Sequence, residues 1–123
     1  MESFIVEESL SSVKIFWLEQ EKLIRKLKEV AQKIGDSDKN VVKIILFGSI
    51  AERRGVPGSD ADIVVLLKKD PKPFPFIERI PEWLKKFDIG FPVDVFPYTI
   101  DEINNPVANN AIKTGMVLFE RKM

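Results

Sequence analysis

The sequence contains neither cysteine nor histidine. Their absence excludes disulfides, thiol nucleophiles, zinc sites built from Cys and His, and Ser-His-Asp triads. Any metal ion must therefore be bound by oxygen ligands, and such ligands favour Mg²⁺, Mn²⁺ or Ca²⁺. The carboxylates are thus the side chains to examine for metal chemistry.

An excess of charge of one sign is also missing, as are long apolar segments. Nineteen basic residues balance nineteen acidic ones, and this net charge of zero does not support broad attraction to nucleic acid. No apolar run approaches the length of a membrane span, and the first residues lack the basic and apolar pattern of a secretion signal. We therefore expect a cytoplasmic protein without a membrane partner.

The length of 123 residues suits one domain, 1–123, with a core of its own. Segments of helical and of strand character alternate along the chain. This alternation predicts an α/β (α+β) fold in which helices pack on a small mixed β-sheet. The segments that carry the candidate site fall within a core of residues 41–120.

Residues 8–34 show the apolar spacing of one long amphipathic helix. Gly35 is expected to end this helix as its C′ residue, before a polar loop at 36–40. The apolar residues recur at three- and four-residue steps and are Leu10, Val13, Trp17, Ile24, Leu27, Ala31 and Ile34.

The rest of the chain divides into short segments separated by glycine and proline. Two apolar, β-branched runs are typical of strands buried on both faces. Asn105 and Pro106 have the features of an N-cap and of the first residue of a helix. The expected elements are strands at 41–47, 63–67, 91–96 and 116–120, helices at 81–87 and 106–115, and a Pro-rich loop at 68–75.

Gly48 and Ser49 follow the first of these strands and precede a short helix expected over 50–54. Glycine lets a phosphate approach the backbone, and the first amides of a following helix can donate to phosphate oxygens. A plain strand-to-helix turn with Ser49 as N-cap would have the same sequence. The pair is a candidate phosphate site that needs support from other residues.

Asp60 and Asp62 stand at the mouth of the strand 63–67. If the strand begins there, both side chains leave the same face, because they are two residues apart. Two carboxylates about 4 Å apart repel by roughly 4 kcal/mol at an effective dielectric near 20, and a divalent cation reverses the sign. The alternative is a solvated turn in which the side chains splay apart.

Asp94 interrupts the apolar strand 91–96 and has a valine on each side. Beside the strand 63–67, its carboxylate would complete a three-carboxylate cluster with Asp60 and Asp62. Such a cluster can hold two Mg²⁺ ions about 3.5–4 Å apart. The alternative is an exposed position on the solvent side of an edge strand.

Three further side chains are candidates for contact with a nucleotide. Arg53 or Arg54 could reach a triphosphate, or both could be surface charges on the short helix. Tyr98, the only tyrosine, could stack on a base or belong to the core or its rim.

Together these residues resemble the nucleotidyltransferase superfamily that includes DNA polymerase beta and the aminoglycoside nucleotidyltransferases. The pattern of that family is Gly-Ser, a spacer, Asp-x-Asp, and a third Asp on a later strand. Here Gly48-Ser49, Asp60 with Asp62, and Asp94 match the three elements. Length and element order look closest to the minimal nucleotidyltransferases of bacteria and archaea, which implies a nucleotidyltransferase-like fold.

The resemblance implies that a hydroxyl attacks the α-phosphorus of an NTP and that pyrophosphate leaves. Asp60 and Asp62 would bind two Mg²⁺ ions, for which Mn²⁺ could substitute. Asp94 would bind the catalytic ion and help to deprotonate the hydroxyl, so the three acids are the implied catalytic and metal-binding residues.

The resemblance also implies the nucleotide contacts. Gly48 and Ser49 would hold the β- and γ-phosphates, and Arg53 is counted with them as nucleotide-binding. Many minimal members have glycine where this chain has Arg53, so the turn after Ser49 departs from the family pattern.

Minimal members are often paired with a small all-helical toxin, and some transfer AMP from ATP to that partner. By resemblance we expect an antitoxin that uses ATP or another NTP in this way. One alternative is a non-catalytic antitoxin that neutralises a helical partner by contact, through the apolar stripe or the Pro-rich 71–75 loop. Another is a small-molecule nucleotidyltransferase. The acceptor, the base preference and a homo-oligomeric state are left open.

Overall fold

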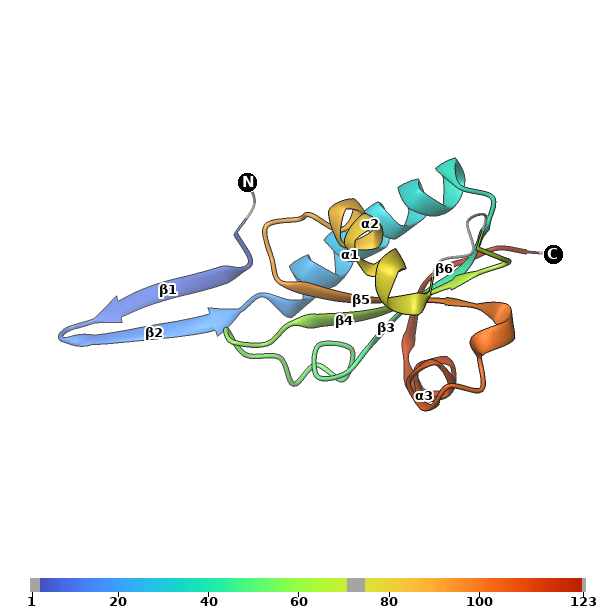
Figure 1. The fold of residues 1–123 in the computed structure, drawn as a ribbon. Coiled ribbons are helices and arrows are strands. Elements are labelled where there is room, and N and C mark those ends of the chain that lie inside the picture. The colour runs from blue at the N-terminus through green and yellow to red at the C-terminus, as the bar shows by residue number, and fades with distance from the viewer. Residues whose placement is uncertain (1–2, 71–74, 123) are drawn as a thin grey trace.

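The computed structural model describes residues 3–70 and 75–122 (Figure 1). Within these ranges a β-hairpin precedes a four-stranded sheet with three α-helices and a 3₁₀ helix. The elements are β1 (Ile5–Leu10), β2 (Val13–Leu18), α1 (Gln20–Ser37), β3 (Val41–Phe47), β4 (Ala61–Leu67), α2 (Phe76–Lys86), β5 (Val93–Thr99), η1 (Ile100–Glu102), α3 (Pro106–Thr114) and β6 (Met116–Glu120).

The four-stranded sheet is mixed and has the strand order β5-β4-β3-β6. β3 is antiparallel to both β4 and β6, whereas β4 and β5 run parallel. The two central strands, β3 and β4, consist mainly of branched apolar residues, as strands buried on both faces do. The predicted small mixed sheet is therefore confirmed.

Helices cover both faces of this sheet (Figure 1). α1 and α2 lie on one face, where Leu27 of α1 and Ile44 of β3 belong to the larger apolar core. α3 lies on the other face, where Ala108 and Ala111 share a smaller cluster with Ile45. The sheet is thus the middle layer of the body, as the prediction of helices packed on a sheet requires.

The helix predicted over 8–34 is wrong in its first part. Residues 5–18 form the hairpin of β1 and β2, and the helix begins only at Gln20. The apolar positions in this part fit both a helical period and the alternation of strands, so their spacing could not decide. The β-branched and aromatic run Val13–Leu18 favours a strand, and Ser11 takes the positive φ of 56° that a tight hairpin turn uses.

Gly35 lies inside α1, which continues to Ser37, so its predicted role as the C′ residue is also wrong. A Cβ at Gly35 would lie 2.3 Å from ring atoms of Phe119 on β6, and glycine is therefore required by packing. The apolar stripe of α1 faces the core rather than solvent. Its buried side chains are Leu23, Ile24, Leu27, Ala31 and Ile34.

The two later helices differ in how well their starts were predicted. α2 begins at Phe76, five residues earlier than expected, and therefore contains Pro81 in its interior. The start of α3 is confirmed, because Pro106 is its first residue and the Asn105 side chain accepts a hydrogen bond of 2.9 Å from the Val107 amide.

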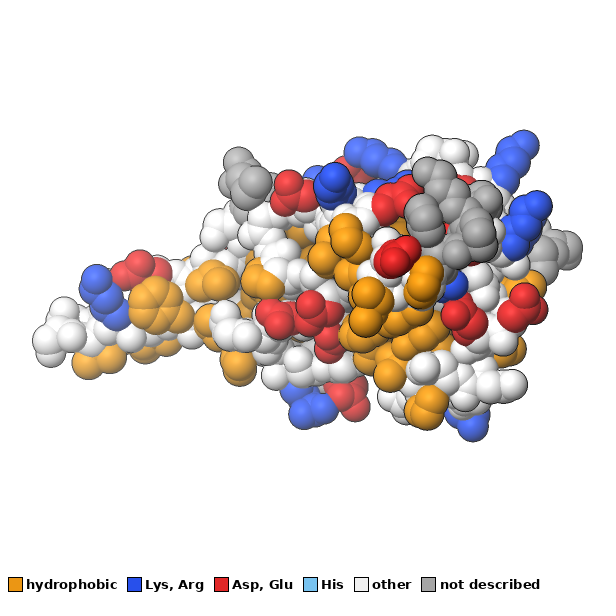
Figure 2. Space-filling view, in the orientation of Figure 1, with side chains coloured by type: hydrophobic (Ala, Val, Ile, Leu, Met, Phe, Trp, Pro, Cys, Tyr) orange, Lys and Arg blue, Asp and Glu red, His pale blue; other side chains and the backbone are white. Residues whose placement is uncertain are grey.

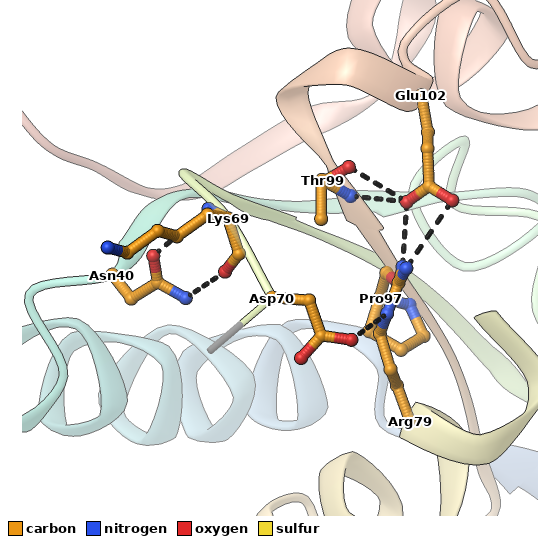
Figure 3. Close-up of polar contacts among 7 residues, drawn as sticks. All are labelled: Asn40, Lys69, Asp70, Arg79, Pro97, Thr99 and Glu102. Carbon is orange, nitrogen blue, oxygen red and sulfur yellow. Dashed lines mark hydrogen bonds and ion pairs between the residues drawn. The ribbon is translucent and has the colours of Figure 1, made fainter. Parts of the chain in front are cut away.

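The predicted loop 68–75 is only partly visible, because residues 71–74 lie outside the described ranges. Before that gap, the side chain of Asn40 holds the backbone of Lys69 at both its N–H and its C=O, at 3.1 and 2.6 Å (Figure 3).

No helix in the described part of the chain is long and apolar enough to cross a membrane.

Arg79 of α2 is buried and connects three segments (Figure 3). Its guanidinium donates to the Pro97 carbonyl at 2.9 Å and pairs with Glu102 at 2.7 Å and with Asp70 at 3.0 Å. Glu102 also accepts hydrogen bonds from the backbone and hydroxyl of Thr99. The network fixes α2 against β5, the strand that carries Asp94.

Candidate active site

The predicted acidic residues gather at the corner where β3 ends and where β4 and β5 begin. Asp62 lies in register with Phe47, the last residue of β3, and with Asp94 on the neighbouring strand β5. Asp60 immediately precedes β4. Figure 2 shows acidic side chains on this face, near the base of the hairpin. The pairing therefore places Asp62 and Asp94 side by side, with Asp60 close in sequence.

Gly48 brings the backbone after β3 directly against Asp62. Its φ is +81°, in the left-handed region, and a Cβ built there would lie 2.6 Å from Asp62 Oδ2. Both the backbone conformation and the close approach therefore require glycine. The glycine and the carboxylate form one structural unit, although they are 14 residues apart in the sequence.

The segment after Gly48 is a compact turn and contains no regular helix, so the short helix predicted over 50–54 is wrong. The Glu52 amide donates to the Gly48 carbonyl at 3.2 Å, and the Arg54 amide donates to the Ser49 carbonyl at 2.7 Å. Ser49 is half-buried at the start of this turn.

Arg53 stands where many minimal members have glycine, and its backbone still adopts a conformation that suits glycine. Its φ is 58°, so it adopts the left-handed conformation that glycine takes most easily. Its side chain is exposed and pairs with Glu21 of α1 at 2.6 Å. The guanidinium therefore points toward the helix in this structure, and a contact with phosphate would require it to leave Glu21.

The electrostatic environment of Asp62 disfavours its charged form. Burial raises the pKa of Asp62, and the negative charges of Asp94 and Asp60 raise it further. Within the described ranges, none of these three carboxylates forms an ion pair with Lys or Arg. The corner is thus an uncompensated acidic site, and a cation bound there would lower its electrostatic energy.

The donor set fits a hard divalent cation, because it consists of carboxylate oxygens without a competing basic partner. The carboxylates of Asp60, Asp62 and Asp94 are not arranged to bind one metal ion together, however. No group of three acidic side chains among residues 3–70 and 75–122 is positioned to hold one metal ion. Asp60 and Asp94 are exposed at the rim, where their side chains can rotate toward Asp62.

The structure shows where Asp94 and Tyr98 lie, and the sequence had left two alternatives open for each of these side chains. Asp94 is exposed on the edge strand β5, as its alternative interpretation proposed, but it still neighbours Asp62. Tyr98 is buried and stacks on Phe76 with ring centroids 4.6 Å apart. Tyr98 is therefore a core residue, which confirms the core position considered for it and does not support stacking on a base.

Gln20, the first residue of α1, has a role that the sequence did not indicate. Its Oε1 accepts a hydrogen bond of 2.7 Å from the Gly55 amide, and its Nε2 donates to the Arg53 carbonyl at 3.4 Å. The amide side chain thus ties the turn after Ser49 to the start of α1. A lone Gln in a helical pattern carries no signal for a contact 35 residues away.

A mixed sheet of this topology, with helices on both faces and acidic residues at the strand starts, defines a nucleotidyltransferase-type domain. Residues 25–123 match the family described as "Polymerase beta, Nucleotidyltransferase". The chain belongs to this family, and the resemblance inferred from the Gly-Ser and Asp residues is confirmed. No curated protein matches the chain.

Two solved structures are similar to this chain. The crystal structure of a proposed nucleotidyltransferase from Sulfolobus solfataricus has a TM-score of 0.61 and 20% sequence identity, covering 83% of this chain and 84% of its own. It shows that the nucleotidyltransferase-like fold is shared. A toxin–antitoxin structure with AMP-PNP has a TM-score of 0.49 and 22% identity, covering 85% of this chain and 76% of its own.

Proposed function

We propose that the protein is a Mg²⁺-dependent nucleotidyltransferase that moves AMP from ATP to a hydroxyl of a helical protein partner and so acts as an antitoxin. The single observation that carries the catalytic part is the pairing of Asp62 with Asp94, with Gly48 against the Asp62 carboxylate. The antitoxin part rests on the resemblance to minimal nucleotidyltransferases. Family membership supports the reaction class.

In the proposed reaction, a hydroxyl oxygen of the acceptor forms a bond to the α-phosphorus while the bond to the pyrophosphate oxygen breaks. Asp94, which is exposed at the rim, would accept the hydroxyl proton. Asp60, Asp62 and Asp94 would hold the divalent cations, which supply charge neutralisation of the phosphates when bound. Gly48 and Ser49 would hold the β- and γ-phosphates, with the Ser49 hydroxyl as a donor, while the Asp62 carboxylate occupies the space that a side chain at Gly48 would take.

Arg53 is the proposed third nucleotide contact. Its pairing with Glu21 is exposed at both ends, with 53% and 66% of the side chains accessible, so the pair contributes little stability. A triphosphate offers a stronger partner to the same guanidinium. We therefore expect Glu21 to be exchanged for phosphate when a nucleotide binds.

The experiment is to incubate the pure protein with α-labelled ATP, Mg²⁺ and the protein encoded beside it in the genome. We expect label on the helical neighbour, no transfer without Mg²⁺, and loss of transfer in Asp62→Asn. Asp88→Asn is the matched control, because Asp88 is exposed and is not among the carboxylates that raise the pKa of Asp62. Transfer that survives Asp62→Asn would refute the assignment of the site.

An antitoxin that neutralises its partner by contact alone is the competing function, and the structure limits the surfaces that it could use. The apolar stripe proposed for it is buried on the sheet in its α1 part, and residues 71–74 of the Pro-rich loop lie outside the described ranges. An Asp60→Asn, Asp62→Asn double variant separates the two functions. The catalytic proposal predicts that this variant still binds the partner but no longer neutralises it.

A further inference from the structure

The hairpin of residues 5–18 carries an unusual amount of exposed apolar surface. It projects away from the body of the molecule (Figure 1), and hydrophobic side chains follow its length in Figure 2. It also precedes the residues that match the family, 25–123. The large apolar side chains exposed on it are Ile5, Leu10, Val13, Ile15, Phe16 and Trp17.

The strand register sorts these side chains onto two faces. Residues directly opposite each other in an antiparallel pair share a face. The pairs Val6↔Trp17, Glu8↔Ile15 and Leu10↔Val13 therefore form one face, on which Glu8 is the only charged residue. The other face carries Glu7 and Lys14, which form an ion pair of 3.5 Å, together with the exposed Ile5 and Phe16.

An apolar face of this kind needs a cover. A two-stranded hairpin is marginally stable in water unless its apolar face packs on something. Within the described ranges, the hairpin extends beyond the body, and its side chains at the tip, Leu10 and Val13, are 54% and 56% exposed. Both outer strand edges also present unpaired backbone groups.

A pocket on the far side of the same chain has matching chemistry. It has a volume of about 150 Å³ and is lined by Ile103, Asn104, Asn109, Ile112 and Lys113. Since a water molecule occupies about 30 Å³ in the liquid, the pocket has room for an apolar side chain. Ile103 and Ile112, both 40% exposed, provide its apolar surface, and Lys113 provides a cation at its rim.

The charges complement each other. Within the described ranges neither Glu8 nor Lys113 forms an ion pair, so an acid in the middle of the apolar face and a cation at the pocket are both available. Opposite charges that meet at an interface fix its register and suppress wrong partners. The amide side chains of Asn104 and Asn109 can bond the unpaired edge of a strand.

The hairpin cannot reach this pocket in its own chain. Its two strands of six residues span about 20 Å, and they point away from the body while α3 lies toward the opposite end of the sheet (Figure 1). A second copy related by a two-fold axis offers its pocket to the hairpin and receives the partner's hairpin in return. Because the two-fold axis repeats the contact, the dimer buries twice the area of one hairpin on one pocket. A stable interface buries about 800 Å² on each partner.

We propose that two copies of this chain form a dimer by exchanging hairpins. The face of Val6, Leu10, Val13, Ile15 and Trp17 docks on the η1–α3 pocket of the other copy, and Glu8 pairs with Lys113 across the interface. The acidic corner is not part of either surface. The variants that test the dimer therefore leave Asp60, Asp62 and Asp94 unchanged.

The first test is the mass of the protein in solution, measured by analytical ultracentrifugation from about 1 to 100 μM. We expect a dimer for the natural chain and at least a tenfold larger dissociation constant for Val13→Thr with Ile15→Thr. Threonine keeps the strand propensity while it removes apolar surface. Val56→Thr is the matched control, since Val56 is 59% exposed in a loop outside the interface, and it should leave the dimer intact.

The second test is a charge exchange, which does not depend on whether the threonine variants fold. Glu8→Lys and Lys113→Glu should each weaken the dimer about tenfold, and the double variant should restore it to within about threefold of the natural chain. A monomer at 100 μM would overturn the proposal and leave the hairpin to a different protein. A dimer unaffected by both single charge variants would overturn it as well.

Discussion

At the scale of single residues, the site depends on two backbone positions with positive φ. Gly48 needs its conformation and its missing Cβ because the Asp62 carboxylate occupies the space. Arg53 holds a left-handed conformation with a full side chain, at a cost of about 1 kcal/mol or more. Such strained positions concentrate at functional sites, and here they flank the turn that follows β3.

Asp62 is the residue whose charge the fold disfavours. Because its pKa is raised by burial and by Asp94 and Asp60, its ionised form destabilises the folded protein. The folded state holds the proton more tightly than the unfolded state, so stability is lost as the pH rises through the raised pKa. We predict that Asp62→Asn raises the melting temperature at pH 7 without metal by about 2–4 °C.

The measurement is thermal unfolding with and without Mg²⁺. Mg²⁺ should stabilise the natural chain but not Asp62→Asn, since a ligand stabilises only the state that binds it. Asp88→Asn, at an exposed position, should leave the melting temperature unchanged. A lower melting temperature for Asp62→Asn in metal-free buffer would contradict this view of the corner.

Arg53 gives a second prediction at this scale. Arg53→Gly should be about 1 kcal/mol more stable to denaturant than Arg53→Ala, because glycine adopts positive φ without strain. At the neighbouring Arg54, which has no positive φ, the order should be reversed, since glycine adds entropy to the unfolded chain. Equal stability of the two Arg53 variants would show that the turn relaxes when the side chain is shortened.

At the scale of elements, the end of β3 and, to within two residues, the starts of β4 and β5 could be predicted, whereas the C-terminal end of β5 and the hairpin could not. The turn Gly48-Ser49 and the acids at 60, 62 and 94 mark where strands end or begin, and strand order then brings them together. The apolar residues of 5–18 fit both a helical period and the alternation of a strand, so their spacing alone led to the wrong prediction of a helix. Gly35 was wrongly predicted to end the helix for a different reason. Glycine is needed there because of the Phe119 ring, which comes from the distant strand β6.

The Arg79 network could not be predicted either, because the partners of Arg79 lie 9 to 23 residues away from it in the sequence and meet it only in the folded chain. Burial alone would raise the pKa of Glu102. The hydrogen bonds from Arg79 and Thr99 and the Arg79 charge outweigh that effect and lower it. The stability from Glu102 is therefore present above its ordinary pKa and is lost as the pH falls through the lowered one.

We predict that Glu102→Gln lowers the free energy of unfolding at pH 7 by about 1.5–3 kcal/mol, the worth of hydrogen bonds to a charged group. The difference from the natural chain should shrink as the pH falls through the lowered pKa of Glu102, where its carboxylate becomes protonated. Urea unfolding at each pH measures it. Glu78→Gln, at an exposed position in the first turn of α2, is the control and should differ little at any pH.

At the scale of the whole molecule, fold and site follow from one mixed sheet with an acidic corner. The mixed sheet and the family were predictable, because buried strands and the Gly-Ser, Asp-x-Asp, Asp spacing are local features of the sequence. The sequence left open whether Asp94 is exposed and whether Tyr98 is buried, and it did not predict the pairing of Arg53 with Glu21, since each depends on which element covers that position.

The central claim is that this corner binds a nucleotide together with Mg²⁺. The most direct measurement is calorimetric titration with a non-hydrolysable ATP analogue, which needs no acceptor. We predict binding that requires Mg²⁺ and that is lost, by at least about tenfold in affinity, in Asp62→Asn and in Asp94→Asn but not in Asp88→Asn. Binding of equal strength without Mg²⁺, or in the two site variants, would contradict the account.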